Sequence, residues 1–256
     1  MAKQRKPFRM KQFAISDARS ANKIGVDGVL IGSWAPLLTT YRRILDAGCG
    51  CGISSLMMAQ RMPEATVVGI DIESNAIEEA IDNAGHSPFA ERIRILSMGF
   101  EDIVDKVGCG LEDRFDLIVS NPPFFASGVN PEKSERMLAR HVGSLSPEKL
   151  IVESRKCLNP GGLLAFIAPY EYLEHYLNLS IDNGYRIFKI CKVKGNPDVK
   201  AKRVMIALQK IEPSLVRDYS NGLIEAINID TLVIENSPGE FTPEYIDLGR
   251  QFYLRF

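Results

Sequence analysis

Short runs of apolar residues alternate with helical patterns from residue 43 onward. The first run predicts a strand at 43–47, and a glycine-rich turn then leads into a helix on which Ile53 and Leu56 share one face. The second run predicts a strand at 65–71, followed by a helix at 74–85. Strand, helix and strand in succession are typical of parallel pairing, so the pattern predicts a parallel sheet.

The same alternation continues through the middle of the chain. Strands are predicted at 93–96, at 115–119 and at 163–167, and a helix at 147–157 precedes the last of these strands. Helices that connect parallel strands cover both faces of the sheet, so the fold class is α/β and Rossmann-like.

The pattern changes toward the end of the sheet. Two apolar runs, at 185–190 and 204–208, are joined by a basic loop with glycine and proline that leaves no room for a helix. They predict a hairpin, so a sheet of seven strands ends antiparallel. Residues 1–40 are expected to form a small N-terminal cap on a Rossmann-like core at 41–256, within one domain, because no linker separates a second domain.

Composition is that of an ordinary globular protein, with 45% hydrophobic and 25% charged residues. No segment approaches the roughly 18 apolar residues of a membrane span, and the basic start lacks the apolar region of a signal peptide. The five cysteines are Cys49, Cys51, Cys109, Cys157 and Cys191. Their odd number and irregular spacing fit a reducing cytoplasm and predict neither a disulfide framework nor a metal site.

The net charge of −1 by itself argues against a nucleic-acid-binding protein, but the charges are unevenly distributed. Residues 1–23 contain seven basic residues and one aspartate, and residues 189–203 contain six basic residues and one aspartate. Each stretch is compatible with a solvated surface and with contacts to nucleic-acid phosphates. The candidate phosphate contacts are Arg5, Lys6, Arg9, Lys200, Lys202 and Arg203.

A glycine-rich motif, Asp-Ala-Gly-Cys-Gly-Cys-Gly, follows the first strand. Gly48 and Gly50 let the backbone turn tightly and approach a ligand, although a purely structural turn would also use glycines. Asp46 opens the motif and would repel a diphosphate but pair with an ammonium group. Asp71, at the end of the second strand, can accept both ribose hydroxyls. A ligand with a ribose, an amine and no phosphates indicates S-adenosylmethionine.

The third strand lacks the terminal acid that commonly meets the adenine amine in such folds. Gly99 and Phe100 occupy this position, so backbone groups and the Phe100 ring are expected to border the adenine, with Asp102 as a weaker candidate. Ile72, directly after Asp71, is also expected to contact the donor.

The sequence Ser-Asn-Pro-Pro-Phe-Phe ends the fourth strand at the edge where ligands bind in parallel sheets. Proline cannot donate to a neighbouring strand, so a plain turn would explain part of the motif. The Asn121 side-chain carbonyl and the Pro122 backbone carbonyl can each accept one N–H of an exocyclic amine and aim its lone pair at a methyl sulfonium. Pro123 stiffens this arrangement, and Phe124 offers a face on which a flipped base can stack. The motif predicts a clamp for a planar amine or amide.

Residues 46–52 and 120–124 together resemble the amino-methyltransferases of the class I S-adenosylmethionine-dependent fold. More specifically, residues 8–36 and 231–256 resemble the two ends of the bacterial tRNA(Val) adenine-37-N6 methyltransferases. The likeness covers nearly the whole chain from Phe8. It implies methylation of N6 of the adenine just 3′ of the anticodon in a valine tRNA, in the cytoplasm. We expect a monomer that needs no metal ion.

The resemblance also assigns residue roles. Asp46, Gly48 and Gly50 would line the donor, and Asp71 would hold its ribose. Asn121, Pro122, Pro123 and Phe124 would form the clamp, and Asn121 would also contact the donor. A segment with Lys23, Asp27 and Gly28 would close over the methionine end of the donor. For Asp27, a helical N-cap is an equal alternative.

Other interpretations stay open. After the clamp, Arg136 and Arg140 are candidate RNA contacts, with salt bridges to nearby glutamates as the alternative. Phe124 in place of tyrosine slightly raises the alternative of a guanine-N2 rRNA methyltransferase, although those enzymes often carry a duplicated domain. A substrate side-chain amide would also suit the clamp, as in protein glutamine-N5 methyltransferases, but 40 residues are too few for their usual N-terminal helical domain. A non-catalytic RNA-binding subunit belongs to a different class, and the intact clamp argues against it.

Overall fold

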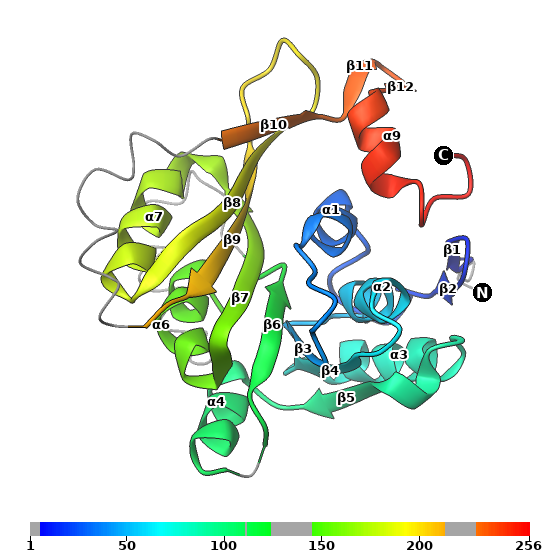
Figure 1. The fold of residues 1–256 in the computed structure, drawn as a ribbon. Coiled ribbons are helices and arrows are strands. Elements are labelled where there is room, and N and C mark those ends of the chain that lie inside the picture. Colours follow the sequence, from blue (N-terminus) through cyan, green and yellow to red (C-terminus); the bar gives the residue numbers. More distant parts are fainter. Residues whose placement is uncertain (1–5, 111, 124–144, 213–228) are drawn as a thin grey trace.

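The computed structural model describes residues 6–110, 112–123, 145–212 and 229–256, and its centre is a single large sheet between two layers of helices (Figure 1). Along the sheet, the strand order is β10-β8-β9-β7-β6-β3-β4-β5. These strands are β3 (Arg43–Ala47), β4 (Thr66–Asp71), β5 (Ile93–Ser97), β6 (Phe115–Ser120), β7 (Leu158–Pro169), β8 (Tyr185–Lys194), β9 (Arg203–Lys210) and β10 (Ile229–Val233). All neighbours pair parallel except β9, which is antiparallel to both β7 and β8.

The predicted α/β fold is confirmed, and each of the seven expected strands is present. The hairpin β8–β9 is antiparallel as expected, but it does not end the sheet, and the predicted seven strands are corrected to eight. An eighth strand, β10, extends the sheet by pairing parallel to β8. Sequence analysis missed it because Leu232 is the one fully buried side chain in this short strand, too little for a recognisable alternation.

Among the described residues, six helices cover the two faces of the sheet. Helices α1 (Val26–Trp34), α2 (Ile53–Arg61) and α3 (Ser74–Gly85) lie on one face, and α4 (Phe100–Gly108), α6 (Pro147–Cys157) and α7 (Leu173–Asp182) lie on the other. Short 3₁₀ turns at Ala90–Arg92 and Tyr170–Tyr172 complete the connections. In the described part of the chain, no helix combines the length and the apolar run that crossing a bilayer requires.

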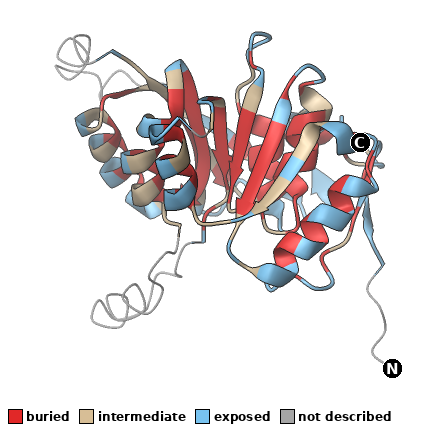
Figure 2. Ribbon diagram, turned by 90° about the horizontal axis from the view of Figure 1, so that it is seen from below, coloured by how far each residue is buried: buried red, intermediate tan, exposed pale blue. Residues whose placement is uncertain are grey.

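Successive residues of the central strands belong to two different apolar cores. Ile44 of β3 packs beneath α1 and α2, whereas its neighbour Leu45 packs toward α4 and α6. In the same way Leu117 and Ile118 of β6 face opposite sides. Burial on both faces, visible in Figure 2, explains why these strands are continuous apolar runs in the sequence.

The two ends of the described chain pack together. A small hairpin of β1 (Phe8–Arg9) and β2 (Ala14–Ile15) lies beside the last residues, where Met10 forms a bridge to Tyr253. The Lys11 amide donates to the Phe252 carbonyl at 2.8 Å. The C-terminal region adds a second hairpin, β11 (Glu235–Ser237) with β12 (Glu240–Phe241), and helix α9 (Pro243–Gly249), which contacts α1.

The chain direction across the sheet marks one edge as the place for a ligand. From β3 the chain proceeds to β4 and β5 on one side, and later to β6 and β7 on the other. The crevice outside the carboxyl ends of β3 and β6 is therefore the topological switch point, where open α/β sheets bind ligands. The turn between β8 and β9 lies at the same edge, because β9 starts opposite Pro169 at the end of β7.

Candidate functional site

A pocket of about 560 Å³ lies at this switch point. Its walls come from the segment that leads into α1, from the glycine-rich loop after β3, and from the ends of β4, β5 and β6. Nine of the ten predicted donor-site positions line it: Lys23, Asp27, Gly28, Gly48, Gly50, Asp71, Ile72, Phe100 and Asn121. Pro122 and Pro123 of the predicted clamp line it as well.

The glycine-rich loop is held against β4 by backbone hydrogen bonds. The amides of Gly48 and Cys49 both donate to the Ile70 carbonyl at 2.9 Å. Gly48 and Gly50 have φ values of 72° and 53°, in the left-handed region that side chains other than glycine disfavour. The loop thereby turns back at the mouth of the pocket, and at these two glycines it presents backbone alone to a ligand.

The Asp71 carboxylate organises the end of β4. Its Oδ2 accepts the Gly50 amide at 2.8 Å, and its Oδ1 accepts the amides of Ile72 at 2.7 Å and Glu73 at 3.0 Å. An ionised carboxylate has about four acceptor positions, so it can still accept from a sugar hydroxyl. Glu73 also lines the pocket, although its side chain caps α3 by accepting the amides of Asn75 and Ala76.

Asp46 is the exception among the predicted donor residues. Its side chain does not line the pocket: the residue is 1% exposed, and its Oδ2 accepts the Ser55 hydroxyl of α2 at 2.6 Å. Burial raises the pKa of Asp46 to about 7 against the opposing hydrogen bond from Ser55, and the charge of Asp71 adds to the rise. The expected direct pairing with an ammonium group is therefore corrected: the buried Asp46 side chain joins the end of β3 to Ser55 of α2.

The buried Asp46 predicts a pH dependence of stability. Because the folded protein holds this proton more tightly than the unfolded chain, the contribution of Asp46 to stability is fully present below about pH 4 and is lost as the pH rises through 7. We expect Asp46→Asn, which keeps an oxygen for Ser55, to remove this loss. Urea unfolding of the donor-free protein should show the variant gaining on the order of 2 kcal/mol relative to wild type between pH 5 and pH 8. The substitution of an exposed acid, Asp102→Asn, serves as control. If the unfolding free energy of Asp46→Asn changed with pH in the same way as that of wild type, the prediction would be contradicted.

Asn121 extends from the end of β6 toward the N-terminal turn of α1. The preceding Ser120 is buried and donates its hydroxyl to the Ala47 carbonyl at 2.7 Å, which fixes the strand end beside β3. A Cβ at Gly28 would lie 3.9 Å from Asn121 Nδ2 and 3.1 Å from Ile53 Cγ2. The absence of a side chain at position 28 thus lets α1 approach the amide of Asn121 closely.

The adenine side of the predicted site has a helix cap at the position where related folds commonly carry an acid. Met98, Gly99 and Phe100 line the pocket. Asp102 does not line it, because its Oδ2 accepts the Gly99 amide at 2.8 Å as a cap of α4. The structure therefore places the backbone around Gly99 and the largely buried Phe100 at this position, and the weaker candidate Asp102 has a local structural role.

Lys23 and Asp27 both line the pocket, yet their charged groups have partners within the protein. The Lys23 ammonium donates to three backbone carbonyls, those of Asp17, Ala18 and Ser20, at 2.7–3.1 Å. Asp27 accepts Arg203 Nε at 2.9 Å. The alternative of a helical N-cap for Asp27 is wrong, because Gly25 occupies the N-cap position of α1.

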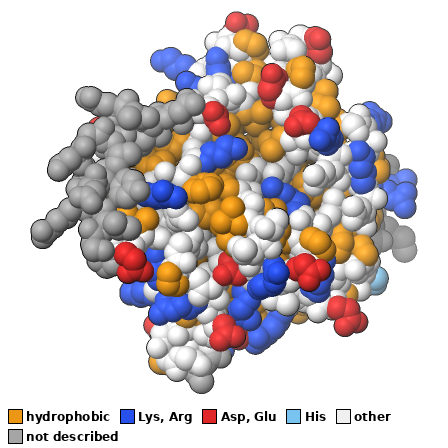
Figure 3. Space-filling view, viewed as in Figure 1, with side chains coloured by type: hydrophobic (Ala, Val, Ile, Leu, Met, Phe, Trp, Pro, Cys, Tyr) orange, Lys and Arg blue, Asp and Glu red, His pale blue; other side chains and the backbone are white. Residues whose placement is uncertain are grey.

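The basic stretches lie in different places. Lys200 and Lys202 are exposed in the β8–β9 turn at the carboxyl edge, and Arg203 beside them is half-buried in its pair with Asp27. Lys6 instead lines a separate cavity of about 690 Å³ against the second half of α3. Figure 3 shows that, on the face of the molecule seen in Figure 1, Lys and Arg side chains are spread out with Asp and Glu side chains among them. Arg9 is exposed on β1, and Arg5, Phe124, Arg136 and Arg140 lie outside the described residues.

Leu145 is a lining residue that sequence analysis missed. It precedes α6, and its Cδ2 would lie 3.1 Å from a Cβ at Gly48. Contact between segments so far apart in the chain leaves no local pattern, so nothing in the sequence around Leu145 could have indicated it.

Comparisons with known proteins define the class of this site. Residues 33–180 match the family model of the methyltransferase small domain. A predicted O-methyltransferase from Agrobacterium tumefaciens shares the fold with a TM-score of 0.59 at 21% identity, over 88% of this chain and 96% of that one. The fold and the pocket are those of an S-adenosylmethionine-dependent methyltransferase.

Full-length relatives narrow the class to one family. The chain belongs to the tRNA1(Val) (adenine(37)-N6)-methyltransferase family. It is 36% identical to the member from Flavobacterium johnsoniae over 97% of this chain and 99% of the relative. The corresponding values are 37%, 96% and 94% for Porphyromonas gingivalis, and 31%, 98% and 96% for Vibrio vulnificus. The family resemblance inferred from the two ends of the sequence is confirmed.

The residues of the pocket suit the donor S-adenosylmethionine. The left-handed Gly50 leaves space where a Cβ would meet no atom within 4 Å. Two carboxylates, Asp71 and Glu73, stand on the side of the pocket formed by β4, and the apolar Ile72 and Phe100 lie next to them. Acids suit a ribose and would disfavour phosphates, which S-adenosylmethionine lacks.

Proposed function

We propose that this protein methylates N6 of adenine 37 in tRNA1(Val), with S-adenosylmethionine as donor. The observation that carries the proposal is the position of Asn121 and Pro122, which line the same pocket as Gly50 and Asp71. An acceptor pair for an amine thus stands beside a site suited to a methyl donor. The family relatives are named for this reaction. A tRNA substrate implies that the protein works in the cytoplasm.

The donor supplies an electrophilic methyl group on a sulfonium. Asn121 Oδ1 and the Pro122 carbonyl oxygen each accept one N–H of the adenine amine, which turns the nitrogen lone pair away from the ring. A new N–C bond forms as the C–S bond breaks, the sulfonium becomes a neutral thioether, and one amine proton leaves to water. No charged base is needed, because the nitrogen loses its proton after it has gained the methyl group.

The other lining residues hold the donor in this proposal. Asp71 would accept the ribose hydroxyls, and the backbone at Gly48 and Gly50 would border the methionine part. Ile72 and Phe100 would lie against the adenine of the donor. Asp27, Gly28 and Lys23 form the wall from α1, in which the Asp27–Arg203 ion pair joins this wall to the β8–β9 turn.

The decisive test is the modified nucleoside. Mass spectrometry of tRNA from a deletion strain should show loss of N6-methyladenosine at position 37 of tRNA1(Val), and purified protein should restore it from labelled donor. Detection of N2-methylguanosine in rRNA or of methylated glutamine in a protein would show that the substrate is one of these and not adenine 37 of the tRNA. Transfer to none of these substrates would favour a non-catalytic RNA-binding subunit.

We also propose that the β8–β9 turn contacts tRNA phosphates beside the clamp. Since RNA affinity depends on local positive charge, Lys200→Ala with Lys202→Ala should raise the KM for tRNA about tenfold and leave the KM for the donor unchanged. The slope of log affinity against log salt should fall by about 1.5. Lys6 and Arg9, farther from the clamp, should act in the same direction with a smaller effect.

Lys156→Ala is a control for the turn variants taken singly, and it removes one exposed charge that pairs with Glu153. Lys156 is exposed near the end of α6, at the opposite edge of the sheet, because α6 leads directly into the start of β7. Its removal should leave the KM for tRNA unchanged. Equal effects of the control and of the turn variants would mean that only the overall charge matters.

A further inference from the structure

Two walls of the donor pocket are irregular segments that cannot hold their own shape. One comprises residues 22–25, which follow β2 and precede α1. The other is the glycine-rich loop, including Cys49, Gly50 and Cys51. Neither wall belongs to a helix or a strand, so hydrogen bonds from other parts of the protein must fix their relative position.

Asn83 of α3 connects the glycine-rich loop to Ser16, which belongs to the segment that leads toward residues 22–25, through its side-chain amide. It is 6% exposed, and its Nδ2 donates to the Ser16 carbonyl at 2.8 Å and to the Cys51 carbonyl at 2.9 Å. Its Oδ1 accepts the Ser16 amide at 2.9 Å. Both donors and the acceptor oxygen of the amide are thereby used on the backbone of two segments distant in sequence.

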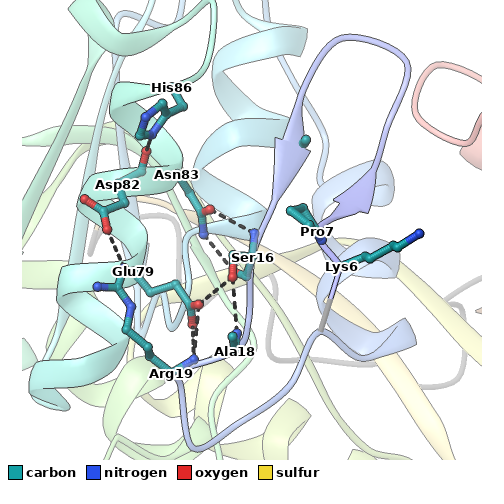
Figure 4. Close-up of a pocket in the computed structure, with 10 residues that line it drawn as sticks. Lys6, Pro7, Ser16, Ala18, Arg19, Glu79, Asp82, Asn83 and His86 are labelled. Carbon is teal, nitrogen blue, oxygen red and sulfur yellow. Dashed lines mark hydrogen bonds and ion pairs between the residues drawn. The ribbon is translucent and has the colours of Figure 1, made fainter. Parts of the chain in front are cut away.

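Glu79, one turn earlier on α3, holds the same N-terminal segment (Figure 4). It is 1% exposed and accepts the hydroxyls of Ser16 at 2.8 Å and Ser20 at 2.7 Å, together with the amides of Arg19 and Ser20. Burial alone would raise the pKa of Glu79, but these hydrogen bonds together lower it to about 2. The side chain is therefore ionised at neutral pH and serves as a charged anchor.

The inner face of α3 thus sets the spacing between the two walls. Ala80, between Glu79 and Asn83, would contact a Cβ at Gly52 at 3.4 Å, so the loop also packs directly on this helix. From Ser20 the chain continues into residues 22–25 of the pocket wall, where Lys23 donates to the carbonyls of Ser20 and Asp17. The anchors act on the pocket through the backbone, since neither Glu79 nor Asn83 lines it.

We propose that Asn83 and Glu79 are positioning residues for the methyl donor. They pre-organise the two walls, so that the donor binds without having to order them. The inference deepens the proposed function and depends on it only for the identity of the donor. It requires no property of the RNA substrate.

The effect to measure is donor affinity in the full-length protein, with S-adenosylmethionine itself as the ligand. Asn83→Ala should weaken donor binding about tenfold in calorimetry and raise the KM for the donor equally. The kcat at saturating donor should stay within about twofold of wild type, because bound donor restores the walls. Glu79→Gln keeps the shape and one acceptor oxygen, so it should give a smaller shift in the same direction.

The control is Asp82→Asn on the same helix, which alters an exposed ion pair with Arg19 and leaves Ser16 and Cys51 untouched. Its donor affinity should equal that of wild type. If Asn83→Ala does not fold, the donor affinity of Glu79→Gln alone tests the positioning role. A donor affinity unchanged in a folded Glu79→Gln or Asn83→Ala, with only the melting temperature lowered, overturns the inference.

The test of the positioning role can fail or succeed independently of the test of the proposed substrate. A product other than N6-methyladenosine would refute the proposed substrate while weakened donor binding in the variants still supports the positioning role. Wild-type protein that binds no S-adenosylmethionine would overturn both.

Discussion

Asn121→Ala is expected to slow methyl transfer by roughly 10²–10³-fold, the scale of removing one well-placed hydrogen-bond partner from a reacting group. The amine would lose one of its two acceptors, and its lone pair would no longer be aimed at the methyl group. Donor affinity should change little, because Asp71 and the glycine-rich loop remain in place. Single-turnover methylation of tRNA with labelled donor measures the rate, and calorimetry measures the affinity.

Two controls separate the clamp from general damage to the strand end. Asn121→Asp keeps acceptor oxygens of the same size and should retain far more activity than the alanine variant. Ser120→Ala removes a buried hydrogen bond to Ala47 without touching the amine, and should lower stability by about 1 kcal/mol with most activity kept. Near wild-type turnover by Asn121→Ala would show that the clamp mechanism is wrong.

The fold was predictable because its central strands are buried on both faces. Such strands must be apolar at successive positions, and Ile44 with Leu45 or Leu117 with Ile118 satisfy both cores at once. The edge strand β10 was not predictable, since a strand with little burial has few constraints on its residues.

The candidate site was predictable where chemistry follows a strand end directly. Asp71, Gly50 and Asn121 are each placed by the strand before them, so local sequence indicated that they meet. The prediction that Asp46 contacts the donor was wrong because the orientation of its side chain depends on packing against α2, where the Ser55 hydroxyl donates to it. Asn83 was missed because its partners are set by the tertiary fold alone.

Charge was the least predictable property from sequence. A run of basic residues shows neither which side chains have internal partners nor where they lie. Arg203 pairs with Asp27, a residue distant in sequence, and Lys23 is bonded to backbone carbonyls, whereas Lys200 and Lys202 of the same run as Arg203 stay exposed. The partners decide which of these charges can contact RNA.

Asp71→Ala is expected to weaken S-adenosylmethionine binding by roughly 1.5–3 kcal/mol, or about 10–150-fold in affinity. The carboxylate has two tasks: it fixes the Gly50 amide at 2.8 Å, and in our proposal it accepts the ribose hydroxyls by charge-assisted hydrogen bonds. Calorimetry with S-adenosylmethionine measures the loss.

A comparison of two ligands distinguishes these two tasks of Asp71. Asp71→Asn keeps an acceptor for Gly50 but removes the charge, so it should weaken S-adenosylmethionine binding by less than the alanine variant does. A donor analogue without ribose hydroxyls should bind wild type weakly and lose little further affinity in Asp71→Asn. Asp102→Asn, an exposed acid near the pocket that does not line it, should bind the donor as wild type does. If Asp71→Asn lost the same affinity for both ligands, the Asp71 carboxylate would only hold the loop. The ribose would then bind elsewhere, and Glu73 is the next acid on that wall.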